Sequence, residues 1–297
     1  MGGAALSQTS VATGSLYLPK LARIRKVIRE THDVVTFQLE LVDEAERKAF
    51  SYKVGQFGEF SMFGVGESTF NISSSPTWKS HFECCFREVG HVTRALARLK
   101  EGDVIGFRGP YGNAYDLERM RGKDLIFAAG GIGFPPIRCL VWNVLAEREK
   151  YGAIVVVHGA RTAGDLIYQR EMAEWSKLPD VHVIKTVDPG GDPPGWDGEV
   201  GFVPTVVEER VPWILERSGK GPENAMAFTC GPPIMTNFVI QALTRMGFGL
   251  GQIVLTLENK MKCAVGKCGR CNIGGTYVCL EGPIFTADQV ATMHDDA

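Results

Sequence analysis

The stretch Lys123-Asp-Leu-Ile-Phe-Ala-Ala-Gly-Gly-Ile-Gly-Phe-Pro-Pro136 decides how the middle of this chain folds. It begins with a short apolar run, which is typical of a strand buried on both faces of a parallel sheet. The glycines of Gly130–Gly133 then allow a tight turn, and the two prolines are tolerated in the first turn of a helix, where their missing N–H has no intrahelical partner. A strand, a glycine turn and a helix in this order let backbone N–H groups approach a pyrophosphate.

On its own this turn is a weak indicator of a nucleotide site. It departs from G-x-G-x-x-G because prolines stand where the last glycine would fall, and a simple tight connection between strand and helix explains it equally well. A second turn, Cys230-Gly-Pro-Pro233, also follows an expected strand. Ligands of open α/β sheets bind at the carboxyl ends of strands, so two such turns in one sheet favour a binding site.

The residues around these turns alternate between strand and helix patterns. Such alternation predicts a doubly wound parallel sheet over residues 119–248. Besides the first strand and a helix reaching about Glu149, the expected strands are Ala153–Gly159, Val181–Val187 and Ala225–Cys230, and the expected helices are Leu166–Leu178, Val203–Glu209 and Ile234–Met246.

Residues 16–118 have a different pattern, rich in short β-strands. Val34–Leu41 partly alternates between apolar and polar residues, Phe57–Phe63 is apolar and aromatic, and His81–Phe86 reads as a further strand. Glycines and prolines separate these strands at short intervals, which predicts an antiparallel β-barrel.

Half of the chain's eight cysteines lie close together near the C-terminus, in the array C-x4-C-x2-C-x7-C formed by Cys263, Cys268, Cys271 and Cys279. Thiolates select soft metals, and this spacing is that of a plant-type [2Fe–2S] loop. A zinc site, which more often pairs two distant C-x2-C units, and a disulfide pair are the alternatives. We therefore expect residues 249–297 to form a cluster-binding segment, entered through a strand at Gln252–Leu257.

Positive side chains surround the cysteine array. They are Lys260, Lys262, Lys267 and Arg270. Together they would raise the potential of an anionic cluster or form a docking patch, whereas singly each reads as a solvated surface charge.

Composition excludes several function classes. A formal net charge of −2 argues against nucleic acid as a partner, and no apolar run is long enough to span a membrane. Residues 1–15 are small and polar without the pattern of a secretory signal, and we expect a disordered extension there. The cysteines outside the array show no disulfide-framework spacing, which indicates a reducing cytoplasm.

Taken together, the motifs resemble a known superfamily. Ile72-Ser-Ser-Ser-Pro76, Gly90-His-Val-Thr93 and Gly109-Pro-Tyr-Gly112 resemble the flavin domain of the ferredoxin–NADP reductase superfamily, and the two turns above resemble its pyridine-nucleotide domain. With its cysteine loop the chain is similar to the electron-transfer subunit of dihydroorotate dehydrogenase. It is more similar still to the gamma subunit of NAD(P)-linked hydrogenases (sulfhydrogenases) and the B subunit of anaerobic sulfite reductase.

The resemblance implies FAD on the barrel, NAD(P)H on the α/β domain and a [2Fe–2S] cluster on the C-terminal segment. Position by position, it places these residues at the cofactors: Phe70, Asn71, Ile72 and Ser73 along the flavin; Gly90, Val92 and Thr93 at the FAD pyrophosphate; Gly131 and Gly133 at the nucleotide pyrophosphate; Cys230 at the nicotinamide as the catalytic candidate; and Cys263, Cys268, Cys271 and Cys279 on the cluster.

One departure affects the flavin. The superfamily motif R-x-[YF]-S falls on Ser68–Asn71, so the arginine that usually neutralises the FAD phosphate is missing. Arg87 and Arg94 are the nearest substitutes, and FMN or an empty flavin site are alternatives to FAD. Arg161 is placed to meet a ribose 2′-phosphate or to pair with Asp165, so the choice between NAD and NADP stays open.

No nucleophile–base array is present, and the six histidines are scattered singly. We therefore expect electrons to leave through the cluster to another protein, and the favoured hypothesis is a diaphorase-type subunit of a hydrogenase, a sulfite reductase or a related complex. A self-standing NAD(P)H reductase or dihydroorotate dehydrogenase subunit is the second hypothesis, and a zinc-binding scaffold without enzymatic activity is the third. The sequence does not identify the partner, the direction of electron flow or the oligomeric state.

Overall fold

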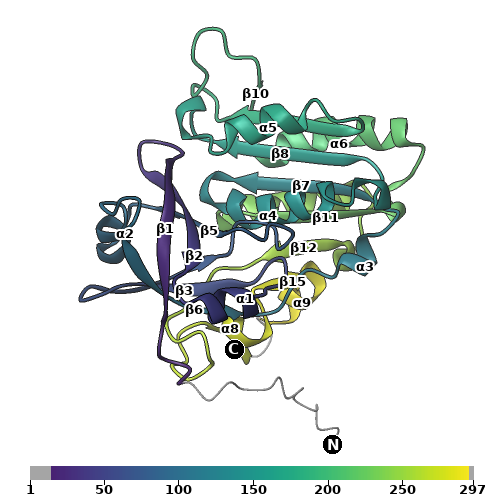
Figure 1. Cartoon of the computed structure of the whole chain (residues 1–297). Helices are drawn as coiled ribbons and strands as arrows, with labels where there is room; N and C mark the ends of the chain where they lie inside the picture. Colours follow the sequence, from purple (N-terminus) through teal and green to yellow (C-terminus); the bar gives the residue numbers. More distant parts are fainter. Residues whose placement is uncertain (1–14, 294–297) are drawn as a thin grey trace, which may run out of the picture.

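The computed structural model describes residues 15–293, so the expected N-terminal extension lies outside the described residues except for Ser15. Two sheets carry the fold, with a barrel (purple and blue) beside an α/β layer (teal and green) and the C-terminal segment (yellow) beneath them (Figure 1). Both expected architectures are therefore confirmed. Over the described residues, no helix combines the length and apolar character needed to cross a membrane.

The first sheet has six antiparallel strands in the order β4-β3-β6-β1-β2-β5. Its edge strands β4 and β5 contact each other, which brings the two ends of the sheet together as in a barrel. The strands are β1 (Lys20–Arg29), β2 (Val34–Leu41), β3 (Phe57–Met62), β4 (Gly66–Asn71), β5 (Phe82–Arg87) and β6 (Val104–Tyr111), with short helices α1 (Glu44–Ala49) and α2 (His91–Leu96) between them.

Aromatic side chains fill the barrel. Phe37 and Phe86 meet edge to face with ring centroids 5.1 Å apart, and Phe60 and Phe107 lie 5.2 Å apart. All four rings are buried, and each belongs to a different strand. Large aromatic rings bury much apolar area, so this cluster holds the six short strands together.

The second sheet has seven strands in the order β10-β9-β8-β7-β11-β12-β15, all parallel except β15, which runs antiparallel to β12. Helices α4 and α5 cover one face and α6 and α7 the other. The strands are β7 (Asp124–Gly130), β8 (Ile154–Ala160), β9 (Val181–Val187), β10 (Glu199–Val200), β11 (Ala225–Cys230), β12 (Ile253–Thr256) and β15 (Ile284–Thr286); the helices are α3 (Leu117–Met120), α4 (Phe134–Leu145), α5 (Gln169–Trp175), α6 (Val203–Ser218), α7 (Pro233–Arg245) and α9 (Ala287–Thr292).

Chain order in this sheet reverses between β7 and β11. From β7 the chain moves outward through β8 and β9, and it then returns to the other side of β7 as β11. Such a reversal leaves a crevice at the carboxyl ends of the two strands, which is where ligands of open α/β sheets bind. Both turns predicted from the sequence lie there.

Some elements differ from the expected ranges. Helix α6 continues to Ser218 instead of ending near Glu209, although Pro212 lies inside it. A proline within a helix costs about 3 kcal/mol. Val211, Ile214 and Leu215 are buried against the sheet, and we attribute the longer helix to this burial. Helix α5 is shorter than expected.

The C-terminal segment shares the second sheet. Strand β12 pairs with β11, and β15 pairs with β12, so strands on both sides of the cysteine loop belong to the second sheet. Between them lie the cysteine loop, a small hairpin of β13 (Asn272–Ile273) and β14 (Thr276–Tyr277), and the short helix α8 (Val278–Glu281).

Candidate functional site

The two glycine turns touch each other at the switch point. A Cβ atom on Gly133 would lie 2.7 Å from the Cα of Gly231 and closer still to the carbonyl oxygen of Cys230. Gly131 has a φ of +53°, a conformation that glycine adopts without strain. The turns therefore need glycine at both positions, and they expose backbone rather than side chains at the carboxyl ends of β7 and β11.

Cys230 ends β11 and is half-buried. Burial, the nearby carboxylate of Glu258 and the Cys139 thiol raise the pKa of Cys230 to about 12. The thiol is therefore uncharged at neutral pH and suits contact with a flat, apolar ring rather than nucleophilic attack. Glu258 lies far from Cys230 in sequence, and only the fold brings the two together.

Residues at and just after the end of β4 offer an aromatic ring and two polar groups that suit a flavin. Phe70 stacks on Phe86, with centroids 5.2 Å apart and ring planes 22° apart, and it stays half-buried. Ile72 instead packs into the barrel core, so only its backbone is available to a ligand. The Nδ2 of Asn71 and the Oγ of Ser73 are shielded from water and have no hydrogen-bond partner within residues 15–293. Buried polar groups without partners are rare, and a flavin carries acceptors and donors that suit them.

At the start of α2, Thr93 caps the helix, and its expected contact with the FAD pyrophosphate stays a prediction. Its hydroxyl accepts the N–H groups of Gly90 (2.8 Å) and Val89 (3.1 Å), so it caps the helix and is already engaged. The first N–H groups of α2, including that of Val92, have no partner within the helix and remain suited to a phosphate.

The two expected substitutes for the missing arginine are placed differently. Arg94 donates to the carbonyl of Val89, 3.1 Å away. Arg87 pairs with Asp33 at 3.3 Å, and its Nη2 lies 3.8 Å from the position of a Cβ on Gly131. Arg87 thus projects from the barrel to the glycine turn of the other domain.

Arg161 is 74% exposed and lies 3.8 Å from Asp165, which is a loose pair. The position fits both interpretations, an ion pair with Asp165 and contact with a ribose 2′-phosphate. An exposed side chain in a weak ion pair is free to turn towards a ligand.

The four cysteines of the array lie close together. The Cys268 thiol lies near Cys263, and the Cys271 and Cys263 thiols both lie near Cys279. Within residues 15–293 no three His, Cys, Asp or Glu side chains converge closely enough for a single ion. Four neighbouring thiolates are what a two-iron cluster requires, since each iron takes two protein ligands.

Backbone N–H groups point at the sulfurs of the array. Cys263 Sγ accepts the N–H groups of Lys267 (3.3 Å) and Cys268 (3.4 Å), and Cys279 Sγ accepts that of Gly266 (3.3 Å). Burial raises the pKa of the Cys263 thiol, but the backbone N–H groups outweigh it and lower the pKa to about 7. Donors of this kind favour the thiolate that a metal needs and tune the cluster potential. The residues present therefore fit a [2Fe–2S] cluster.

The cysteine segment rests on the barrel through contacts that the sequence did not reveal. The Thr69 hydroxyl on β4, which donates to Glu59 Oε1 (2.6 Å), lies 3.4 Å from the carbonyl oxygen of Met261, and Arg108 Nη1 on β6 donates to the carbonyl of Cys263 (3.4 Å). Asn113 donates to the carbonyls of Glu281 and Ile284, at 2.8 and 2.7 Å, and accepts the N–H of Ile284. Thr69 is two residues from Asn71 on one strand, so the flavin candidates and the cysteine loop are neighbours.

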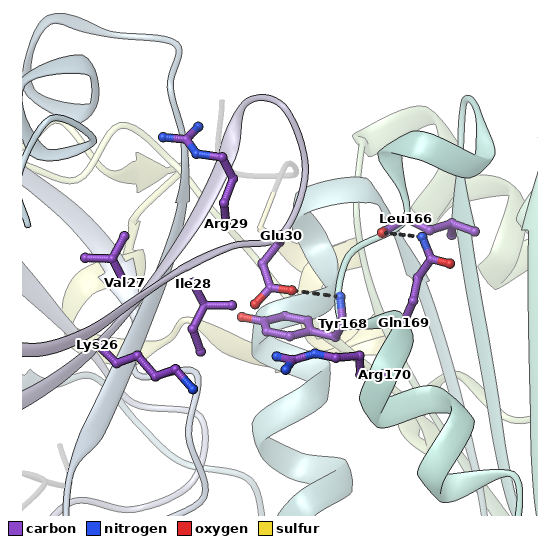
Figure 2. Close-up of a pocket in the computed structure, with 9 residues that line it drawn as sticks. All are labelled: Lys26, Val27, Ile28, Arg29, Glu30, Leu166, Tyr168, Gln169 and Arg170. Atoms are coloured by element: carbon purple, nitrogen blue, oxygen red, sulfur yellow. Dashed lines mark hydrogen bonds between the residues drawn. The ribbon is translucent and has the colours of Figure 1, made fainter.

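A cleft of about 360 Å³ opens elsewhere, between the end of β1 and the start of α5 (Figure 2). Its polar lining includes Lys26, Arg29 and Arg170, and none of the sequence-predicted site residues borders it. In this cleft Glu30 accepts the backbone N–H of Tyr168 at 3.2 Å, which ties the barrel to the α/β domain.

Three domain families match the chain in order along its length. An oxidoreductase FAD-binding domain matches residues 21–115, and an oxidoreductase NAD-binding domain matches residues 127–241. The iron–sulfur cluster binding domain of dihydroorotate dehydrogenase B matches residues 258–291 and so includes all four cysteines of the array.

Curated relatives match nearly the whole chain. The sulfhydrogenase 1 subunit gamma of Pyrococcus furiosus is 35% identical over 263 residues, which cover 87% of each protein. A probable dihydroorotate dehydrogenase B (NAD(+)) electron transfer subunit of Methanocaldococcus jannaschii is 32% identical over 275 residues, covering 92% of this chain and 91% of the relative.

The fold also matches solved structures. A chain of an NADH-dependent reduced ferredoxin–NADP oxidoreductase superposes with a TM-score of 0.68 and 23% identity, covering 96% of this chain and 95% of the other. The cytochrome b5 reductase domain of Ulva prolifera nitrate reductase superposes with a TM-score of 0.62 and 22% identity over 80% of this chain and 96% of the other.

Proposed function

Because the chain belongs to the family of NAD-linked flavoprotein electron-transfer subunits that includes sulfhydrogenase gamma and the dihydroorotate dehydrogenase B subunit, we propose that it exchanges electrons with a partner catalytic subunit through its cluster. The protein is an NAD(P)H-dependent oxidoreductase that uses FAD and an iron–sulfur cluster. Within it we assign residues 16–118 to FAD, 119–248 to NAD(P)H and 249–297 to the cluster. We place the protein in the cytoplasm.

Bound FAD supplies the switch between a two-electron nucleotide and a one-electron cluster. In this proposal the half-buried ring of Phe70 supports the flavin, and Asn71 and Ser73 offer their unpaired polar groups to it. The N–H groups at the start of α2 hold the FAD pyrophosphate in place of the missing arginine, with Gly90 and Val92 at this turn. Thr93 keeps the turn in shape through its capping bonds.

The nicotinamide nucleotide lies across the two glycine turns. Gly131 and Gly133 bring backbone N–H groups to its pyrophosphate, and Arg87 supplies a positive charge from the barrel side. The uncharged thiol of Cys230 contacts the nicotinamide and keeps water from it. Because the thiol is already protonated, it does not act as a base. Arg161 is our candidate for contact with the adenosine ribose, where a 2′-phosphate would pair with it.

One observation carries the proposal: the strand that holds the flavin candidates also touches the cysteine loop, through Thr69 and Met261. Cys268 is exposed, and so are the four basic residues Lys260, Lys262, Lys267 and Arg270. An electron that reaches the cluster is therefore close to the protein surface. We propose a hydrogenase, a sulfite reductase or a related iron–sulfur complex as the partner, and a self-standing reductase as the alternative.

Anaerobic purification followed by a UV–visible spectrum tests this proposal. Flavin bands and broad cluster absorption, both bleached by NADH or by NADPH, support it and identify the nucleotide. A colourless protein that contains zinc and ignores both nucleotides would contradict it. Size-exclusion chromatography of the native protein then separates the two variants of the proposal, because a subunit elutes with its partner and a self-standing reductase elutes alone.

A further inference from the structure

Arg138 of α4 joins the barrel to the α/β domain from a fully enclosed position. Only 2% of the residue is exposed. Its Nη1 donates to the Glu83 carboxylate of β5 (2.6 Å) and to the carbonyl of Ser73 (2.9 Å). Its Nε and Nη2 donate to the two oxygens of Glu171 of α5, each at 2.6 Å. One guanidinium thus links two helices of the nucleotide domain to two segments of the barrel.

Aromatic rings enclose this guanidinium. The Tyr168 ring lies 4.3 Å from it and the Trp78 ring 5.3 Å. Trp142 Nε1 donates to the same Glu171 carboxylate at 2.6 Å. Tyr168 is itself held by the barrel, since its hydroxyl meets that of Thr36 at 3.1 Å and its N–H binds Glu30 (Figure 2).

A buried network of charges adds little stability to the contact between two domains. Removing one guanidinium and two carboxylates from water costs about as much as their attraction returns, and apolar residues in their place are often as stable. Burial raises the pKa of Glu83, but the guanidinium of Arg138 outweighs it and keeps that pKa below its usual range, so the carboxylate is charged. The network therefore contributes little net stability, but it fixes the relative position of the two domains through four bonds to carboxylates and one to the Ser73 carbonyl.

The bond to Ser73 indicates which two parts of the molecule the network holds in place. Ser73 follows Asn71 by two residues at the end of the flavin strand, and Arg138 follows Gly133 by five residues, in the second turn of the helix that the nucleotide turn begins. We propose that Arg138 is a positioning residue that sets the separation of flavin and nicotinamide by locking the flavin strand to the nucleotide helix. This inference rests on the flavin and nucleotide placement of the proposed function.

The first test needs neither cofactor. In flavin-free protein, hydrogen–deuterium exchange is measured at the N–H of Ser73, which binds the Glu83 carbonyl, and at the N–H of Tyr168. Arg138→Met should speed exchange in both segments at least about tenfold, because the hydrogen bonds that hold these segments to α4 are lost. Asp124→Asn is the matched control. It changes another fully buried polar side chain, whose oxygens accept from Ala153 and Ser218 at the amino end of β7, and should leave both segments unchanged.

The second test measures flavin reduction by NADH or NADPH in a stopped-flow instrument, at saturating nucleotide and per bound flavin. A displacement near 1 Å costs up to about 100-fold in rate. Arg138→Met should therefore lower the limiting rate by about 10- to 100-fold and weaken the long-wavelength charge-transfer band, while dithionite still reduces the cluster fully. Asp124→Asn should lower thermal stability and keep the rate.

If Arg138→Met does not fold, Glu171→Gln replaces it, since that change keeps the side-chain volume and removes one charge of the network. If the variant keeps both the wild-type rate of flavin reduction and the wild-type exchange, the inference is overturned. The proposed function still stands in that case, provided that a nucleotide reduces the flavin of the wild-type protein. A wild-type protein that neither nucleotide reduces overturns both.

Discussion

Replacing Gly133 with alanine should separate the two turns that form the nucleotide site. The added Cβ would lie 2.7 Å from the Cα of Gly231, whereas nonbonded carbon atoms need about 3.5 Å. The turns must therefore move apart by roughly 0.8 Å, the difference between these values. Overpacking of this kind costs about 1–3 kcal/mol, and a shift near 1 Å at a reacting site costs up to about 100-fold in rate.

We expect Gly133→Ala to bind flavin normally, to bind NAD(P)H at least about tenfold more weakly, and to melt roughly 2–12 °C lower. The assays are nucleotide titration followed by flavin absorbance, together with calorimetry. Gly251→Ala is the control, since its Cβ would meet Asp288 Oδ2 at 3.6 Å, an ordinary contact. Wild-type nucleotide affinity and melting temperature in Gly133→Ala would refute our description of the touching turns.

Three further predictions concern the cluster and the core. Cys279→Ser should abolish the [2Fe–2S] absorbance and lower bound iron at least tenfold while FAD stays, because a buried ligand is lost; unchanged iron content would contradict the ligand assignment. Asn113→Ala should cost about 2–3 kcal/mol in urea unfolding, since three hydrogen bonds to the C-terminal segment are lost, whereas Asn272→Ala, which loses one exposed hydrogen bond, should cost under about 1 kcal/mol. Burial lowers the pKa of His158 to about 3, below its ordinary 6.5, so the folded state binds fewer protons. Its contribution is fully present above pH 6.5 and is lost as the pH falls towards 3, about 2 kcal/mol by pH 5. His158→Leu should remove this part of the pH dependence measured by urea unfolding, and an unchanged pH dependence would count against it.

The sheets and turns were predictable because their determinants are local. The apolar run before Gly130 and the glycines after it fix a strand and a turn within fourteen residues, and the structure places both as β7 and the switch-point turn. The cysteine array is equally local, since its four thiols lie within seventeen residues and the fold keeps them close together.

The missed features depend on contacts between distant residues. Arg138, Glu83 and Glu171 come from three segments, and none carries a motif, so only the packed domains reveal their network. The continuation of α6 past Pro212 likewise depends on burial against a sheet, which outweighs local propensity. Strand β15 is three residues long, and only its pairing with β12 defines it.

The capping role of Thr93 shows a different limit. Sequence alone indicates a hydroxyl near a helix start, but it does not tell whether that hydroxyl faces a ligand or its own backbone. In the structure the hydroxyl accepts the N–H groups of Gly90 and Val89, and contact with a ligand stays a prediction.

The central claim is that electrons pass between the nicotinamide nucleotide and the cluster by way of the flavin. EPR spectroscopy of anaerobic protein after addition of NADH or NADPH tests it most directly, alongside a sample stripped of flavin. We predict the signal of a reduced [2Fe–2S] cluster in the complete protein, and no such signal in the flavin-free protein until dithionite is added. A cluster that neither nucleotide reduces in the complete protein, or that they reduce equally well without flavin, would contradict the claim.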